Sequence, residues 1–246
     1  MIEWKKIKKL DPSEKVKQKY ELKGWKAELF DLVFGFACAA LLYYLILPFL
    51  LGATPPAVVV QSCSMKGALN VGEVVVLKGA SFEEINAPTV QLDSEIDFSV
   101  VLDNQTQETT KLIFSDNQTL DVQENGDTVV YTSKISGEQI IHRVIAKVQT
   151  PEGRYYLTKG DANNLPDAVR LECTQWDFSG QICQKLRING ICTENDIGYG
   201  GCIATPVKEQ DIAGRQFFSV PLIGHVKMIA MHIVTLGHGY PGPAWC

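Results

Sequence analysis

Cysteine is scarce in this chain, and an excess of positive charge is missing. Seven cysteines among 246 residues are too few to build a domain as a disulfide scaffold. A net charge of −5 and a pI near 5.4 offer no overall basic surface to nucleic acid. The hydrophobic share of 46% is high enough for one or two domains with a proper core, which excludes disordered and collagen-like chains.

Helical periodicity and phosphate-binding loops are also missing beyond residue 56. Without crossover helices the chain cannot form parallel βαβ units, and no glycine-rich loop with a helix behind it is present. Short β-branched runs alternate instead with Gly, Asp and Asn, which predicts a mainly β fold. The expected strands are residues 57–61, 73–78, 128–131, 140–149, 155–158 and 216–220.

No charged residue interrupts the apolar run at residues 32–52. As a helix rising about 1.5 Å per residue, this run is roughly 30 Å long, which matches the hydrocarbon core of one bilayer. A helix buried in a soluble domain would carry a polar stripe, and a cleavable signal peptide has a shorter apolar core. We interpret the run as an uncleaved transmembrane anchor whose last turn is loosened by Pro48.

Residues 1–31 are basic, with nine lysines against six acids, so they carry +3 and the remainder carries −8. Lysines close to a membrane segment stay cytoplasmic, so we expect the N-terminus inside and an extracytoplasmic β-rich domain at residues 53–227. Residues 228–246 are expected to form a tail lying along the membrane. A second span is the alternative for the apolar part of that region.

Two stretches of the exterior part have the composition of insertions. Residues 88–125 are acidic and repeat Asp-Asn-Gln-Thr, which predicts a hairpin or small sheet and makes Asn104 and Asn117 candidate glycosylation sites. Residues 168–206 hold four cysteines without the close pairs typical of zinc sites, so two disulfides of open pairing are expected. The candidates are Cys173, Cys183, Cys192 and Cys202.

Residues suited to acyl transfer follow or lie within the predicted strands. Ser62 and Ser64 come directly after one strand, His142 lies inside another, and Asp161 and Asp167 follow a third. Serine is a poor nucleophile until a base takes its proton, and a histidine base works best when a carboxylate fixes its tautomer. Each residue also has a plainer interpretation, as a turn former or a hydrogen-bonded structural residue.

The order of these motifs resembles that of a type I signal peptidase of the archaeal and endoplasmic-reticulum kind. The family's S-G-S-M corresponds to SCSM at 62–65, its G-D to GEVV at 72–75, and its second G-D strand to GDTVV at 126–130. Its H-R-V corresponds to IHRV at 141–144, and its T-K-G-D-x-N…D to TKGDAN at 158–163 with Asp167. Its I-x-G and P-x-I-G correspond to IAG at 212–214 and PLIG at 221–224. The resemblance covers residues 32 to about 233, apart from the two insertions.

The resemblance implies a chemical role for each candidate residue. Ser64 is the expected nucleophile, His142 the general base and later the general acid, and Asp167 the carboxylate that orients His142. Asp161 is the alternative third member. The Ser62 hydroxyl is expected to form an oxyanion hole with the backbone N–H of Ser64.

The implied fold is a signal-peptidase-like β-barrel or sheet, and the implied function is a membrane-bound serine endopeptidase. It would remove signal peptides from exported preproteins, cutting after small residues in an A-x-A-like pattern. An extended substrate is expected to add to a sheet edge near Val58, Val60 and Met65. The bilayer and protein-translocation machinery are further expected partners, nucleic acid is not, and no metal or organic cofactor is implied.

Two positions depart from the family pattern. Cys63 replaces the glycine between the serines, and Gly67 stands where a proline commonly follows the S-M pair. A thiol there is expected to crowd the loop, and a glycine turn to be less rigid than a proline turn. These departures leave open a non-catalytic, membrane-tethered binding or accessory subunit of the same fold. A narrow-specificity processing peptidase, with insertions that select its clients, is the other alternative.

Overall fold

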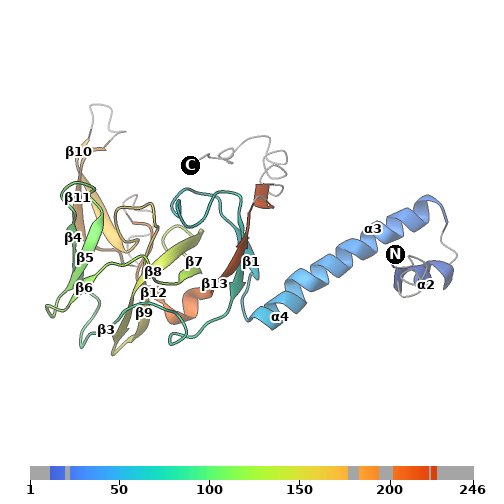
Figure 1. Ribbon diagram of the computed structural model, residues 1–246, viewed down its shortest axis with the longest axis horizontal. Helices are drawn as coiled ribbons and strands as arrows, with labels where there is room; N and C mark the ends of the chain where they lie inside the picture. Colours follow the sequence, from blue (N-terminus) through green and yellow to red (C-terminus); the bar gives the residue numbers. More distant parts are fainter. Residues whose placement is uncertain (1–11, 20–22, 177–182, 194–201, 222, 226–246) are drawn as a thin grey trace. The chain divides into compact units, whose positions relative to one another are not determined.

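The computed structural model describes residues 12–19, 23–176, 183–193, 202–221 and 223–225 (Figure 1). The chain divides into two compact units, Met1–Leu50 and Leu51–Cys246. Helices make up the described part of the first unit, and the second is mainly β. The predicted mainly β class with one N-terminal apolar helix is therefore confirmed.

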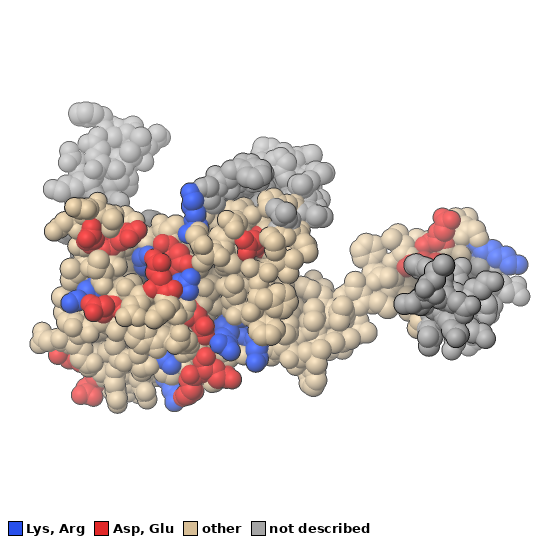
Figure 2. Space-filling model, viewed as in Figure 1, with Lys and Arg blue, Asp and Glu red and all other residues tan. Residues whose placement is uncertain are grey.

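A long apolar helix dominates the first unit. After α2 (Pro12–Lys19), the helix α3 (Trp25–Leu41) continues through a π-helical turn (Leu42–Ile46) into α4 (Leu47–Leu51). The π-helical turn lies directly before Pro48, which has no backbone N–H to donate and whose ring disturbs a regular α-helix. Trp25–Leu51 has a mean hydropathy of 2.2 and is long and apolar enough to cross a membrane. Its charged residues are Lys26, Glu28 and Asp31, and Figure 2 shows charged atoms near the N-terminal part of this helix.

The second unit is built on one large sheet with the strand order β1-β2-β13-β7-β8-β9-β12, and β3 pairs in parallel with β8. The strands that follow one another in this order are antiparallel. Their bounds are β1 Ala57–Val59, β2 Val74–Lys78, β3 Thr89–Gln91, β7 Thr128–Thr132, β8 Gln139–Thr150, β9 Gly153–Lys159, β12 Val207–Lys208 and β13 Ile212–Val220. All six predicted strands are present.

The barrel alternative is wrong for this sheet, because among the described residues β1 and β12 end the strand order without pairing to each other. The two strands contain three and two residues, which is too short for a ladder that would close a barrel. The sheet alternative of the prediction is therefore the correct one.

Both predicted insertions form small sheets of their own. The first contains β4 (Phe98–Leu102), β5 (Thr109–Phe114) and β6 (Thr119–Asp121), and exposed Asn104 and Asn117 lie in the turns on either side of β5. The second contains β10 (Val169–Trp176) and β11 (Cys183–Ile191). A disulfide joins Cys192 to Cys202, as predicted for this region. The side chains of Cys173 and Cys183 lie outside the described part of the structure.

The two faces of the sheet have separate cores, and strand alternation assigns each residue to one of them. Val130 packs with Met65 in one cluster, whereas Val129 and Tyr131 pack with Tyr156 in another. Successive side chains of a strand point to opposite faces. The face of a polar residue in these strands therefore follows from the core in which its apolar neighbours pack. Figure 1 shows β7 and β8 side by side, in agreement with their pairing.

Candidate active site

Three neighbouring strands present polar side chains on one face of the sheet. Tyr131 on β7 pairs with Ile140 on β8, two residues before His142, and Thr158 on β9 pairs with Val144, two residues after it. Directly opposed residues and residues two apart share a face, so Tyr131, His142 and Thr158 lie on the same side. All three are buried, with relative exposures of 0%, 4% and 2%.

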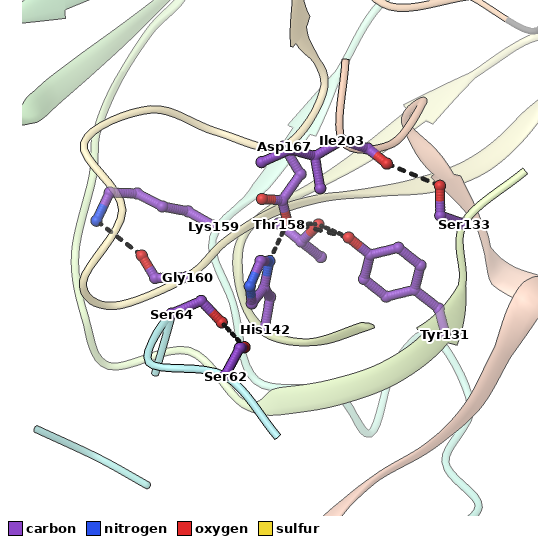
Figure 3. A network of polar contacts seen from close by, with 10 residues as sticks. All are labelled: Ser62, Ser64, Tyr131, Ser133, His142, Thr158, Lys159, Gly160, Asp167 and Ile203. Atoms are coloured by element: carbon purple, nitrogen blue, oxygen red, sulfur yellow. Dashed lines mark hydrogen bonds and ion pairs between the residues drawn. The ribbon is translucent and has the colours of Figure 1, made fainter. Parts of the chain in front are cut away.

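Asp167 is the centre of this group (Figure 3). Its Oδ2 lies 2.6 Å from Nδ1 of His142, and it accepts hydrogen bonds from Thr158 Oγ1 at 2.8 Å and from Tyr131 OH at 3.0 Å. The residue is 1% exposed, so these donors replace the water that a carboxylate would otherwise bind. With Nδ1 donating its proton to Asp167, Nε2 of His142 is left as the proton acceptor.

The two aspartates of the sequence prediction have different partners. Asp161 makes a bidentate ion pair with Arg143, at 2.8 Å from Nε and 2.6 Å from Nη2. Arg143 also donates Nη1 to the carbonyl of Gly126 at 2.7 Å. The hydrogen bonds to Asp161 raise the pKa of Arg143 above its ordinary value, so the guanidinium stays charged. Asp167 therefore contacts His142, whereas Asp161 holds the turn after β9.

The serine segment is a tight turn anchored by apolar side chains. Met65 is fully buried and Leu69 is 2% exposed, and the N–H groups of Ala68 and Leu69 donate to the carbonyl of Met65. Gly67 has φ +104, in a region that side chains rarely adopt and that proline cannot reach. The proline of the family pattern would not fit this turn. Glycine is present at residue 67 because the turn needs a positive φ.

The Ser62 and Ser64 hydroxyls lie together at the start of that turn. Their Oγ atoms are 3.1 Å apart, with Ser64 half-buried and Ser62 exposed (Figure 3). The carbonyl of Ser64 accepts a hydrogen bond from the N–H of Ala162 at 2.8 Å. This bond attaches the serine turn to the turn that follows β9.

Gly160 brings Ser64 and His142 together. A Cβ at Gly160 would lie 2.7 Å from the Ser64 carbonyl oxygen and 2.9 Å from Nε2 of His142. These distances are shorter than real Cβ contacts, so the approach requires a residue without a side chain. Nε2 of His142 therefore faces the backbone of the serine turn, while its Nδ1 faces Asp167.

Ser64 and His142 are adjacent but are not hydrogen-bonded to each other in the described part of the chain, where Ser64 Oγ contacts Ser62. Active-site hydrogen bonds are often long in a free enzyme and shorten when substrate binds.

Other candidate residues have structural partners. Val60 is 1% exposed and packs in the core with Met65, so neither offers an open surface to a peptide, whereas Val58 is half-buried. Cys63 takes part in a disulfide bond, so its sulfur is not a free thiol. Its partner lies outside the described side chains.

Three lysines that could replace His142 as a base have other contacts. Lys134 pairs with Asp211, Lys147 donates to the Phe82 carbonyl, and Lys159 donates to the carbonyl of Gly160 at 3.3 Å. Over the residues that the structure describes, no group of three or more His, Cys, Asp or Glu side chains is arranged to hold a metal ion.

The sequence prediction missed Tyr131, Thr158 and Gly160. Thr158 and Gly160 flank Lys159 in the T-K-G-D motif, but no spacing rule shows what they touch. Tyr131 lies in β7, 11 residues before His142, and only the β7–β8 register brings the two to one face. A register prediction for that hairpin was the one signal available.

The chain matches no family model and no curated protein. The site is therefore interpreted from its geometry and from the motifs that supply its residues.

Proposed function

We propose that the protein is a membrane-anchored serine endopeptidase of the signal-peptidase type, which removes signal peptides from exported preproteins. The observation that carries the proposal is the buried pair of Asp167 and His142, whose free Nε2 adjoins the Ser64 turn across Gly160. Orientation by a buried carboxylate prepares a histidine to act as a base. A histidine with only a structural role would not need a serine turn next to Nε2, on the side of the ring away from the carboxylate.

The reaction uses each group at a stated atom. Ser64 Oγ attacks the scissile carbonyl carbon while its proton passes to Nε2 of His142, and Asp167 stabilises the imidazolium. His142 returns the proton to the departing amine as the C–N bond breaks, which leaves an acyl group on Ser64. Water then releases the acyl group, again with His142 as base. Ser62 Oγ and the Ser64 N–H are the proposed donors to the oxyanion.

The connection between anchor and site favours a substrate at the membrane surface. Gly52 ends the apolar run and Ser64 follows 12 residue steps later, which is at most about 40 Å even in an extended chain. β1 lies between them and leads to Ser62. We therefore place the reaction close to the outer face of the bilayer, where signal-peptide cleavage sites emerge, with the basic N-terminus in the cytoplasm.

The decisive experiment is cleavage of a preprotein by the full-length protein in liposomes, with the new N-terminus sequenced. The variants are Ser64→Ala, His142→Lys and, as a matched control, Ser94→Ala, whose exposed hydroxyl contacts only the Glu95 carbonyl. We expect the wild type and Ser94→Ala to cut after a small-x-small site, and both site variants to lose cleavage.

A different outcome would identify the accessory-subunit alternative. If the folded wild type cleaves none of several preproteins but binds their signal segments, the enzyme proposal is wrong. Cleavage of one preprotein among many would instead indicate a narrow-specificity processing peptidase.

A further inference from the structure

Asp167 receives its hydrogen bonds on one oxygen. Oδ2 contacts His142, Tyr131 and Thr158, whereas Oδ1 is buried and has no hydrogen-bond partner within the described residues. A buried carboxylate needs donors to remain ionised, and those donors fix which oxygen faces the histidine. The hydroxyls of Tyr131 and Thr158 therefore act on the same oxygen that His142 uses.

The hydroxyls of Tyr131 and Thr158 hydrogen-bond to each other and to Asp167. Tyr131 OH and Thr158 Oγ1 are 3.0 Å apart, and each carries one proton. In either arrangement of the two protons, at least one hydroxyl donates to Oδ2. Burial raises the pKa of Tyr131 well above its ordinary value, so its hydroxyl remains a proton donor throughout the working range.

We propose that Tyr131 is a positioning residue whose hydroxyl, together with that of Thr158, orients the Asp167 carboxylate and sets the basicity of His142. This inference rests on the proposed peptidase function and deepens it. Among the described residues, the hydrogen bonds of the Tyr131 hydroxyl go to Asp167 and Thr158, so its effect passes through Asp167.

A second buried tyrosine provides a matched comparison. Tyr156 lies in the same apolar cluster as Tyr131 and is also 0% exposed, but its hydroxyl has no hydrogen-bond partner among the described residues. Removing either hydroxyl changes the apolar packing equally little. Only the Tyr131 hydroxyl acts on Asp167.

The charged side chains on the strands next to His142 and Asp167 have other hydrogen-bond or ion-pair partners. Lys159 on β9 donates to Gly160 O, and Arg143 on β8 is paired with Asp161. Substitution of Tyr131 leaves these contacts in place. A change in the titration of His142 can therefore be assigned to Asp167.

The test compares Tyr131→Phe with Tyr156→Phe in the full-length protein in detergent. Without the Tyr131 hydroxyl, Asp167 holds the His142 ring less firmly, and such a misplacement should lower kcat roughly tenfold to a hundredfold in Tyr131→Phe, with little change in KM. With one donor gone, Oδ2 bears more negative charge and stabilises the imidazolium, so the acidic limb of the kcat profile should move to higher pH. Tyr156→Phe should match the wild type in both respects.

A second readout needs no substrate. The rate of deuterium exchange at the ring carbon of His142, followed by mass spectrometry against pH, reports its titration directly. We expect the midpoint to move upward in Tyr131→Phe and not in Tyr156→Phe. Equal midpoints in the two variants would overturn the proposal. A wild type that fails to cleave would contradict the peptidase function, but the exchange comparison would still decide the role of Tyr131.

Thr158 supplies a further pair of variants if Tyr131→Phe does not fold. Thr158→Val removes the other donor to Oδ2, and Thr158→Ser restores a hydroxyl at the same place. We expect an upward shift in Thr158→Val and its reversal in Thr158→Ser. A shift common to both would indicate a packing effect and would contradict the proposal.

Discussion

The two halves of the site differ in how they are held. The base half, formed by His142, Asp167, Tyr131 and Thr158, is buried and fixed by side-chain hydrogen bonds across three strands. The nucleophile half is a partly exposed turn held by backbone hydrogen bonds and two apolar anchors. In the proposed reaction, the sheet thus fixes the group that acts as the base, while the serine that acts as the nucleophile lies on a turn.

The largest expected effect lies in the base half. Asp167→Asn keeps the size of the side chain but replaces an acceptor with an amide, which favours the wrong histidine tautomer and should lower kcat about 10⁴-fold. Asp161→Asn breaks the ion pair with Arg143. If the two variants are equally stable, it should lower kcat far less than Asp167→Asn does. Cleavage kinetics and thermal unfolding of both variants check this. A larger loss in Asp161→Asn would make it the third member.

In the nucleophile half, Ser62→Ala should lower kcat by about 10²- to 10³-fold if its hydroxyl stabilises the oxyanion. Ser62→Thr retains a hydroxyl and should recover part of the activity. The measurement is kcat and KM for one preprotein. A kcat within twofold of the wild type in Ser62→Ala would leave Ser62 as a turn former only.

Gly160 joins the two halves, so Gly160→Ala should separate them. The new methyl group would lie within 3.0 Å of Ser64 and His142, and a displacement of about 1 Å can cost about 10²-fold in rate. Gly137→Ala is the control. A methyl group at Gly137 would contact no other atom, and the positive φ would strain the backbone only in that turn, outside the site. If both variants keep wild-type kcat, the halves are not joined through Gly160.

The smallest effect concerns the shape of the serine turn. Gly67→Ala should lower the free energy of unfolding by about 1–2 kcal/mol, since a left-handed backbone disfavours a side chain. Gly67→Pro should lower it further, because proline fixes φ near −65°. Chemical denaturation of both variants measures this. An increase in stability in Gly67→Pro would show that the turn accepts the proline of the family pattern.

Alternation predicted six strands of the large sheet, and motif order predicted His142 and the Asp167 beside it, but neither predicted Tyr131 or Thr158. They were not sufficient to choose between Asp161 and Asp167, because both follow one strand and only the turn decides which carboxylate returns to the sheet. The choice between barrel and sheet stayed open in the prediction because strand length at the sheet ends is poorly defined by sequence. Burial of Val60 and Met65 depends on which face the serine turn packs against, and that requires the register.

The second insertion begins and ends at one place. Cys192 N donates to the Ala168 carbonyl, Ala204 N donates to that of Asp167, and the disulfide holds the Cα atoms of Cys192 and Cys202 5.8 Å apart. Val169 and Ile191 pair with each other and pack in the core, so the rest of β10 and β11 is a side branch whose two ends already meet, and the chain can be rejoined there by a short turn. For a protein engineer this makes the hairpin an exchangeable part, open to replacement by a tag, a binding loop or another hairpin while Asp167 keeps its backbone partners.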